Sequence, residues 1–178
     1  MRAERQVGFT LIEMLMVVAI VVVLGFVAMS AYRRYLASAR KSEVMSLFAE
    51  IRAREEAYRS EFSAYASSGT GEDDLWPKLA GASEPKAKDW MPTPGNWSAL
   101  GVNPGKGQVY CGYSVVAGDA ASFAAAAGTR GKAAFATAPT GPWWYATGIC
   151  DNDGSSAKNA TYLTTSESQT LYEQFIQN

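Results

Sequence analysis

The sequence predicts an α+β fold, in which one long N-terminal helix packs on an antiparallel sheet of about four strands. Three observations lead to this prediction. An apolar run near the N-terminus is long enough to span a membrane as a helix, and an amphipathic helical pattern follows it. Short β-rich segments separated by turn residues then make up the C-terminal part. The length of 178 residues and the 48% of apolar residues fit one folded domain with extensions.

The apolar run covers residues 9–31 and follows a short basic segment, residues 1–8, that contains Arg2 and Arg5. As a helix, these roughly 23 residues would measure about 30 Å or more, enough to cross a bilayer. Because basic residues favour the cytoplasmic side, we expect the N-terminus inside and the remainder of the chain across the membrane. Glu13 is the only charged residue of the run, and a charge in a membrane span usually has a partner.

Residues 32–65 continue the helical pattern with an apolar stripe on one side and charges on the other. The stripe consists of Val44, Leu47, Phe48, Ile51, Tyr58, Phe62 and Tyr65. The predicted charged side consists of Arg40, Lys41, Glu43, Glu50, Arg52, Arg54, Glu55, Glu56, Arg59 and Glu61. Oppositely charged pairs four residues apart are Glu50/Arg54, Arg52/Glu56 and Glu55/Arg59. Neither Pro nor Gly occurs between Phe26 and Ser68, so we predict one continuous helix from Phe9 to Tyr65, about 85 Å long.

Residues 66–107 are rich in Gly, Ser and Pro, and we predict a long loop that packs on the rest of the fold. Its three tryptophans, Trp76, Trp90 and Trp97, favour packing over solvation, and a ligand or adhesion surface is the alternative use. Residues 108–178 contain the sheet and a C-terminal tail. The predicted strands are Gln108–Val116, Lys132–Thr137, Trp143–Ile149 and Ala160–Thr165. The Ala-rich stretch 117–127 is a hairpin loop or a short helix, and the tail 166–178 packs back as a final turn or edge.

The sequence gives little indication of catalysis or of a cofactor. It has no histidine, the commonest general base and metal ligand, and its net charge of −1 does not indicate a nucleic acid partner. Cys111 and Cys150 are predicted to form a disulfide if this part lies outside the cytoplasm, with two unpaired buried thiols as the alternative. Asp151 and Asp153, before Gly154, are a weak candidate calcium site, and a polar hairpin turn is the preferred interpretation.

The segment Gly8-Phe9-Thr10-Leu11-Ile12-Glu13 resembles the class III signal of type IV prepilins and pseudopilins. This resemblance implies that a prepilin peptidase cuts after Gly8 and methylates the new amine of Phe9. It also implies that Glu13 meets the Phe amine of an adjacent subunit. A cut at this place would give Glu13 a cation within the same apolar layer, near the helix N-terminus, where negative charge is favoured. The partner would be the Phe9 amine of the same chain or that of a neighbouring subunit, and only the second would make Glu13 an assembly residue.

The resemblance covers residues 8–65 closely and the remainder only in layout. It implies a pilin-like fold and a structural subunit of a helical surface filament that is not an enzyme and needs no cofactor. The implied partners are other pilin subunits, the prepilin peptidase, an assembly ATPase and a platform protein. Before assembly, the chain would sit in the inner membrane with its C-terminal part in the periplasm. Val22 and Ser30 stand where many major pilins carry Gly and Pro, which favours a minor pilin or a pseudopilin and leaves helix melting open.

Several alternatives remain at this point. A pseudopilin of a type II secretion or DNA-uptake system shares the same N-terminus. A membrane-anchored binding module would use the tryptophan-bearing loop, and an exported enzyme would need a site that the sequence does not reveal. The apolar run itself is alternatively a secretory signal peptide cut before Ala31 or an uncleaved signal anchor. For Arg33 and Arg34, location at the membrane interface is preferred to salt bridges between subunits.

Overall fold

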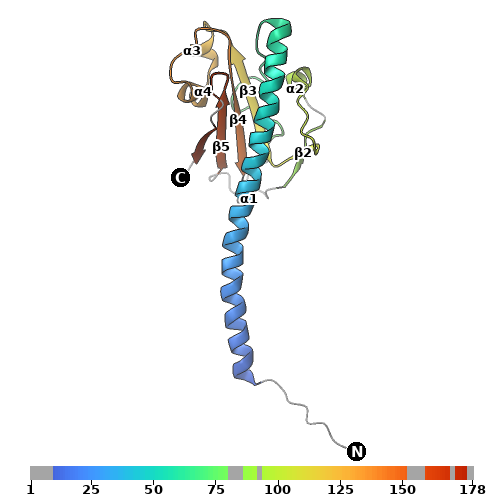
Figure 1. The fold of residues 1–178 in the computed structure, drawn as a ribbon, viewed down its shortest axis with the longest axis vertical. Helices are drawn as coiled ribbons and strands as arrows, with labels where there is room; N and C mark the ends of the chain where they lie inside the picture. The colour runs from blue at the N-terminus through green and yellow to red at the C-terminus, as the bar shows by residue number, and fades with distance from the viewer. Residues whose placement is uncertain (1–9, 80–85, 92–93, 152–158, 169–170, 176–178) are drawn as a thin grey trace, which may run out of the picture. The chain divides into compact units, whose positions relative to one another are not determined.

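The computed structural model describes residues 10–79, 86–91, 94–151, 159–168 and 171–175. Helix α1 runs from Leu11 to Phe62 over 52 residues (Figure 1). The predicted single helix is therefore confirmed. It ends three residues earlier than expected, where Ser63 adopts a left-handed backbone conformation with φ of 58°. The chain divides into two compact units, an N-terminal unit of residues 1–38 and a C-terminal unit of residues 39–178.

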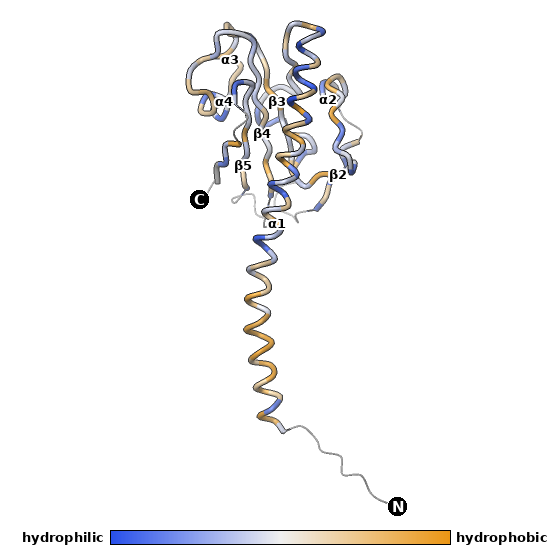
Figure 2. The backbone as a smooth tube through the Cα atoms, in the orientation of Figure 1, coloured by the Kyte–Doolittle hydropathy of each residue, from blue (hydrophilic) through white to orange (hydrophobic). Residues whose placement is uncertain are grey.

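In the N-terminal unit, the stretch of α1 from Leu11 to Met29 is exposed and is apolar on all sides except at Glu13. Every large apolar side chain from Leu11 to Met29 is between 50% and 78% exposed. Figure 2 shows that most of this stretch is coloured as hydrophobic, with one hydrophilic turn near its start. By length and composition, α1 can cross a membrane. A helix that is apolar on all sides cannot remain in water at low cost, so this surface requires lipid or other protein around it.

The C-terminal unit contains a four-stranded antiparallel sheet in the order β3-β4-β5-β6. The strands are β3 (Cys111–Gly118), β4 (Trp143–Asp151), β5 (Asn159–Thr165) and β6 (Tyr172–Phe175). A separate two-stranded ladder pairs β1 (Lys88–Asp89) with β2 (Gln108–Val109). The fold class is thus α+β as predicted, and the C-terminal tail supplies the edge strand β6.

The predicted strand Lys132–Thr137 is wrong. Residues 129–134 form helix α4 (Thr129–Ala134), which follows α3 (Phe123–Ala126) in the Ala-rich part of the chain. A Cβ at Gly131 would lie 2.3 Å from Cε1 of Tyr145, so only glycine lets this helix approach the sheet so closely. At the start of α4, the N–H of Arg130 donates to Oε2 of Glu72 over 3.0 Å, which satisfies a donor that a helix N-terminus leaves free.

One stripe of α1 packs against one face of the sheet. The buried side chains of this cluster include Val44, Leu47, Phe48 and Ile51 from α1 and Tyr113, Trp144 and Tyr162 from the strands. Successive residues of a strand point to opposite faces, so Trp143 and Tyr145 lie on the other face. There Trp143 packs edge-to-face against Phe123 and Phe135, at ring separations of 5.1 and 6.3 Å. Both faces of the sheet are therefore covered.

The long loop packs down as predicted, because two of its tryptophans are core residues. Trp90 is fully buried and Trp97, in helix α2 (Gly95–Leu100), is 1% exposed. Trp76 is half-buried, and its backbone N–H and C=O pair with those of Tyr113 at 2.7 and 2.8 Å. This bridge covers part of the outer edge of β3, which would otherwise be open to pairing with another chain.

Two residues expected on the charged side of α1 are buried instead. Arg40 is 5% exposed and Glu55 is not exposed at all. Arg52 also departs from its predicted pairing with Glu56, because its Nη2 donates to Oγ1 of Thr164 (3.1 Å) and to two backbone carbonyls. Of the three predicted pairs along the helix, Glu50/Arg54 is confirmed, with 3.9 Å between Nε and Oε1.

Glu55 is a buried acid whose carboxyl group makes one hydrogen bond among the described residues. Its Oε2 accepts from the N–H of Ala66 over 3.0 Å, just beyond the end of α1, and its Oε1 has no partner among the described residues. Burial raises the pKa of Glu55 to about 8, partly offset by the Ala66 N–H and reinforced by Glu56. The carboxyl is therefore neutral in the folded chain at neutral pH.

We expect Glu55→Gln to remove a pH dependence of stability. The folded-state pKa of about 8 lies above the ordinary value of 4.5, so the folded chain holds this proton where the unfolded chain has lost it. Stability due to Glu55 is thus complete below pH 4.5 and lost as pH rises through 8. Glu55→Gln should match the natural chain at pH 5 and exceed it by about 3 kcal/mol at pH 8.

Chemical denaturation of the full chain in detergent at both pH values checks this expectation. Glu61→Gln is the matched control, since Glu61 is an exposed acid on the same helix. Equal pH dependence in Glu55→Gln and in the natural chain would show that Glu55 ionises normally.

Candidate assembly site and its scaffold

The first turn of α1 is closed by a reciprocal pair of side chains, Thr10 and Glu13. Oε2 of Glu13 accepts from the backbone N–H of Thr10 (2.8 Å) and from its hydroxyl (2.7 Å). In return, the N–H of Glu13 donates to Oγ1 of Thr10 over 3.3 Å. This is a capping box, in which two otherwise unpaired backbone donors are satisfied at the helix N-terminus.

The capping box leaves one oxygen of Glu13 available. Oε1 of Glu13 has no partner among the described residues, and the side chain stands in a layer that is otherwise apolar. Gly8 and Phe9, the predicted cleavage and methylation positions, lie outside the described residues. The structure thus gives Glu13 a fixed position at the start of α1. The predicted contact between Glu13 and an amine stays a prediction.

Thr10 is a site residue that sequence reasoning missed. The spacing Thr-x-x-Glu before an apolar run is itself the sequence signature of a capping box. The resemblance assigns residues 8–13 to processing and assembly, whereas the spacing of Thr10 and Glu13 also predicts where the helix begins.

The predicted disulfide is present between Cys111 and Cys150, and both residues are fully buried. The two cysteines are directly opposite each other on β3 and β4, with 4.3 Å between their Cα atoms. Such a short separation is typical of strand positions that do not exchange backbone hydrogen bonds. The disulfide therefore links the two strands at the end of their ladder.

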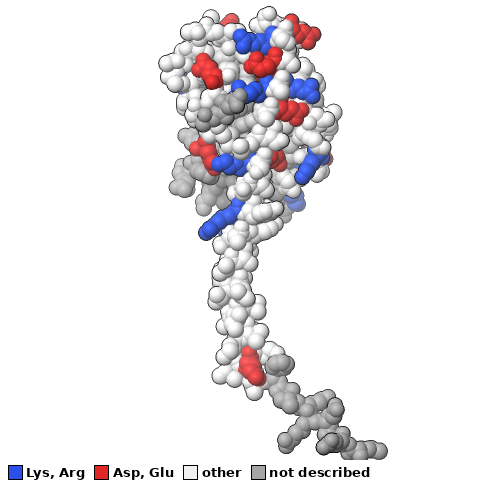
Figure 3. Space-filling view, in the orientation of Figure 1, with Lys and Arg blue, Asp and Glu red and all other residues white. Residues whose placement is uncertain are grey.

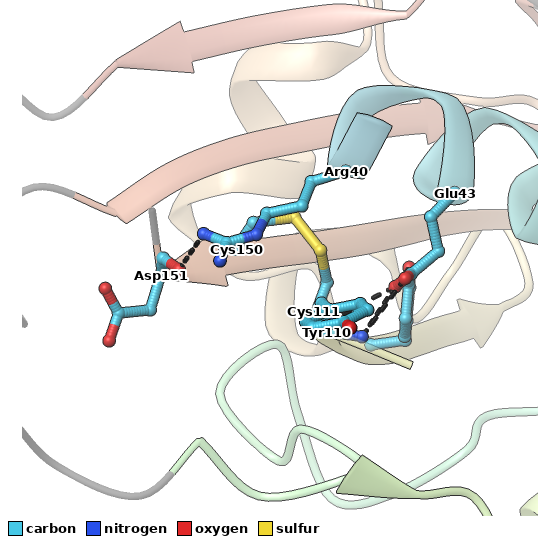
Figure 4. The surroundings of a disulfide bond; sticks show 7 residues. Arg40, Glu43, Tyr110, Cys111, Cys150 and Asp151 are labelled. Atoms are coloured by element: carbon cyan, nitrogen blue, oxygen red, sulfur yellow. Dashed lines mark hydrogen bonds between the residues drawn. A yellow bond between two sulfur atoms is a disulfide. The ribbon is translucent and has the colours of Figure 1, made fainter. Parts of the chain in front are cut away.

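Two side chains of α1 form hydrogen bonds with the backbone on either side of this disulfide (Figure 4). Arg40 donates to the carbonyl oxygen of Asp151, which follows Cys150, and its guanidinium lies 5.7 Å from the ring centre of Tyr110. Glu43 accepts from the N–H groups of Tyr110 (2.9 Å) and Cys111 (3.2 Å). These contacts attach α1 to both strands where the disulfide joins them.

The hydroxyl of Tyr113 completes the surroundings of Glu43. It donates to Oε1 of Glu43 over 2.9 Å and is fully buried. Burial, followed by the charge and the hydrogen bond of Glu43, raises the pKa of the Tyr113 phenol well above its ordinary value. The phenol therefore stays protonated and serves as a donor to the carboxylate.

Glu43→Ala is expected to destabilise the C-terminal unit by about 2–3 kcal/mol. The substitution leaves the N–H of Cys111 and the Tyr113 hydroxyl, both of buried residues, without their acceptor, and unsatisfied buried donors are costly. The exposed Tyr110 loses the same acceptor. Chemical denaturation of the full chain in detergent measures the loss. The control is Glu61→Ala, for which we expect a change within about 0.5 kcal/mol. An equally small effect of Glu43→Ala would mean that water replaces the carboxylate.

The weak calcium candidate gains no support. Asp151 ends β4, and Asp153 lies outside the described residues. Within the described ranges, no group of three or more acidic or cysteine side chains is placed to hold a metal ion.

The described residues of the tryptophan-bearing loop form an open depression. Trp90 and Trp97 are buried in the core, and Trp97 also contributes to the lining of the depression. Trp76 is half-buried and lines a depression together with Asp74, Lys78 and Asn96. Its indole N–H already donates a hydrogen bond to the carbonyl oxygen of Trp90, over 2.9 Å. The aromatic surface that the described residues of this loop offer to a ligand is therefore small.

The structure shows an exposed apolar helix end with a capped N-terminus and a four-stranded antiparallel sheet. It also shows a buried disulfide whose neighbouring backbone is hydrogen-bonded to Arg40 and Glu43. No family model matches this chain, and neither a curated protein nor a solved structure matches it.

Proposed function

We propose that this chain is the structural subunit of a type IV pilus or of a closely related filament. It is made as a prepilin, is cut after Gly8 by a prepilin peptidase, and assembles through its apolar helix half. The proposed partners are further copies of this chain, other pilins and the assembly machinery. We propose no catalytic role, no cofactor and no nucleic acid partner.

The observation that carries the proposal is the exposed apolar part of α1, from Leu11 to Met29. Fully burying one large aliphatic side chain is worth about 1.5–3 kcal/mol, so leaving the whole stretch from Leu11 to Met29 in water would be prohibitive. A bilayer can cover it first and a bundle of identical helices can cover it later. A chain that moves from the inner membrane into a filament uses both environments.

The position of Glu13 supports the same proposal. Oε2 is committed to Thr10, whereas Oε1 has no partner among the described residues. Cleavage after Gly8 would create an α-amine at Phe9, and a second copy would bring such an amine into the same apolar layer. A charge pair there is favoured because water is excluded. Glu13 would therefore set the register between neighbouring subunits.

A pseudopilin of a type II secretion or DNA-uptake system is the second candidate. Helix α1 continues from Leu11 to Phe62 without a break, and its sequence contains no proline. The resemblance described above associates a proline near the end of the span with many major pilins. Its lack favours a minor or pseudopilin subunit over a major one.

Mass spectrometry of the N-terminal peptide, from cells and from a sheared surface fraction, tests the proposal. A peptide that begins at methylated Phe9 in sheared material is the expected result for a pilin. The same peptide found only in membranes would favour the pseudopilin. A chain that begins at Met1 or Ala31 would overturn both candidates and leave an anchored or secreted domain.

A further inference from the structure

Four consecutive residues, Tyr32-Arg33-Arg34-Tyr35, interrupt the apolar surface of α1 within the N-terminal unit. Tyr32 is 59% exposed and Tyr35 is 71% exposed, and both arginines are exposed as well. Neither guanidinium has an ion-pair or hydrogen-bond partner among the described residues. Two unpaired cations between two tyrosines therefore follow directly on the apolar stretch.

The next basic residues along the chain are occupied, in contrast to Arg33 and Arg34. Arg40 is bound to the carbonyl of Asp151, and Nζ of Lys41 lies 2.5 Å from a carboxylate oxygen of Glu173. The four residues 32–35, which we call the Tyr-Arg ring, are thus the part of this basic region with charge available for an external anion.

The four side chains surround the helix. Successive residues of an α-helix are about 100° apart, so four consecutive positions cover nearly the whole circumference. A contact with one neighbouring helix would instead use a stripe of residues three or four positions apart. A ring suits a layer that encloses the helix on all sides, as the headgroup layer of a bilayer does.

The position of the ring along α1 fits the same layer. Tyr32 lies 21 residues after Leu11, which corresponds to about 32 Å of helix at 1.5 Å per residue. The hydrocarbon core of a bilayer is about 30 Å thick. Figure 3 shows that, in this view, the surface of this stretch is uncharged apart from one acidic side chain near its start. Tyrosine is enriched at membrane interfaces, and arginine reaches headgroups while its stem stays apolar.

We propose that the Tyr-Arg ring binds the phosphate groups of anionic phospholipids at the membrane face opposite to the N-terminus. This inference rests on the proposed membrane-spanning role of α1 and adds to it a lipid preference and a fixed depth. Arg33 and Arg34 supply the charge, and Tyr32 and Tyr35 fill the boundary between acyl chains and headgroups. The ring holds the subunit at this depth until it leaves the bilayer.

Lipid selectivity of the full chain tests the proposal. The chain is reconstituted in phosphatidylcholine bilayers, and the association of spin-labelled phosphatidylglycerol is compared with that of spin-labelled phosphatidylcholine. Each basic residue near a membrane surface adds roughly five-fold to anionic lipid binding, so we expect a preference on the order of ten-fold or more for phosphatidylglycerol. The preference should fall as salt is raised. In Arg33→Gln/Arg34→Gln it should nearly vanish.

The control variant is Lys106→Gln/Lys132→Gln, which removes two exposed positive charges from the C-terminal unit and should retain the preference. If the arginine variant inserts normally and still prefers phosphatidylglycerol, the ring proposal is overturned while the membrane span stands. The same holds if lipid preference is unchanged and only filament incorporation is lost, because the arginines would then contact other subunits. If neither spin-labelled lipid loses mobility in the presence of the chain, the chain does not contact the bilayer interior, and the proposed span and the ring are overturned together.

Discussion

Glu13→Gln is expected to be processed normally and to lose assembly by on the order of a hundred-fold or more. In the proposed filament, the amine of Phe9 would be left as an uncompensated charge in an apolar layer, which is strongly unfavourable. Glutamine is the informative replacement because it can still close the capping box with Thr10. The substitution therefore removes the charge and leaves the start of the helix in place.

The measurement is the amount of chain in a sheared surface fraction relative to the amount in membranes, together with the N-terminal peptide in each. Glu61→Gln provides the control for loss of an acid elsewhere on α1 and should assemble normally. Thr10→Val tests the alternative that Glu13 acts only as a cap. If Thr10→Val is as defective as Glu13→Gln, capping and not charge explains the requirement, and normal assembly of Glu13→Gln would refute the pairing altogether.

The helix and the sheet could be predicted because they depend on periodicity and local propensity. The apolar run and the stripe from Val44 to Ile51 follow a helical period, and β4 and β5 are rich in β-branched and aromatic residues. These patterns determine the element type without knowledge of what packs against it. The pairing of Cys111 with Cys150 followed from there being two cysteines in the chain.

The buried charges on α1 were missed although the spacing contained the signal. Arg40 and Glu55 continue the apolar stripe through Val44, Leu47 and Ile51 at intervals of three or four residues. The prediction placed both residues on the charged side because charged residues are seldom buried without a partner, although their spacing put them on the apolar stripe. The partners, the carbonyl of Asp151 and the N–H of Ala66, come from segments whose approach depends on tertiary structure.

The error over Lys132–Thr137 has a similar origin. A short Ala-rich segment is compatible with strand or helix, and the choice is made by contacts with distant residues. Gly131 lies against the ring of Tyr145, and Glu72 binds the N-terminus of α4. The edge position in the sheet is then filled by β6, which had little strand signal of its own because it is short and half polar.

Replacement of both cysteines, as Cys111→Ala/Cys150→Ala, is expected to lower the free energy of unfolding by about 4 kcal/mol. The disulfide closes a loop with a sequence separation of 39, and the chain-entropy model gives about 4 kcal/mol for a loop of this size. Chemical denaturation of the full chain in detergent measures the loss. The natural chain unfolded under reducing conditions should show the same midpoint as the variant, since both lack the cross-link.

The surroundings of the disulfide add a second, separable expectation. Arg40 and Glu43 bind the backbone of Asp151, Tyr110 and Cys111, whose relative positions the disulfide helps to fix. Contacts that share the same constrained backbone are energetically coupled, so Glu43→Ala should cost less in the variant without cysteines than in the natural chain. Additive losses would mean that the strand ladder alone positions these groups. A smaller loss in the cysteine-free chain would mean that the disulfide and the two α1 side chains act as one attachment between the helix and the sheet.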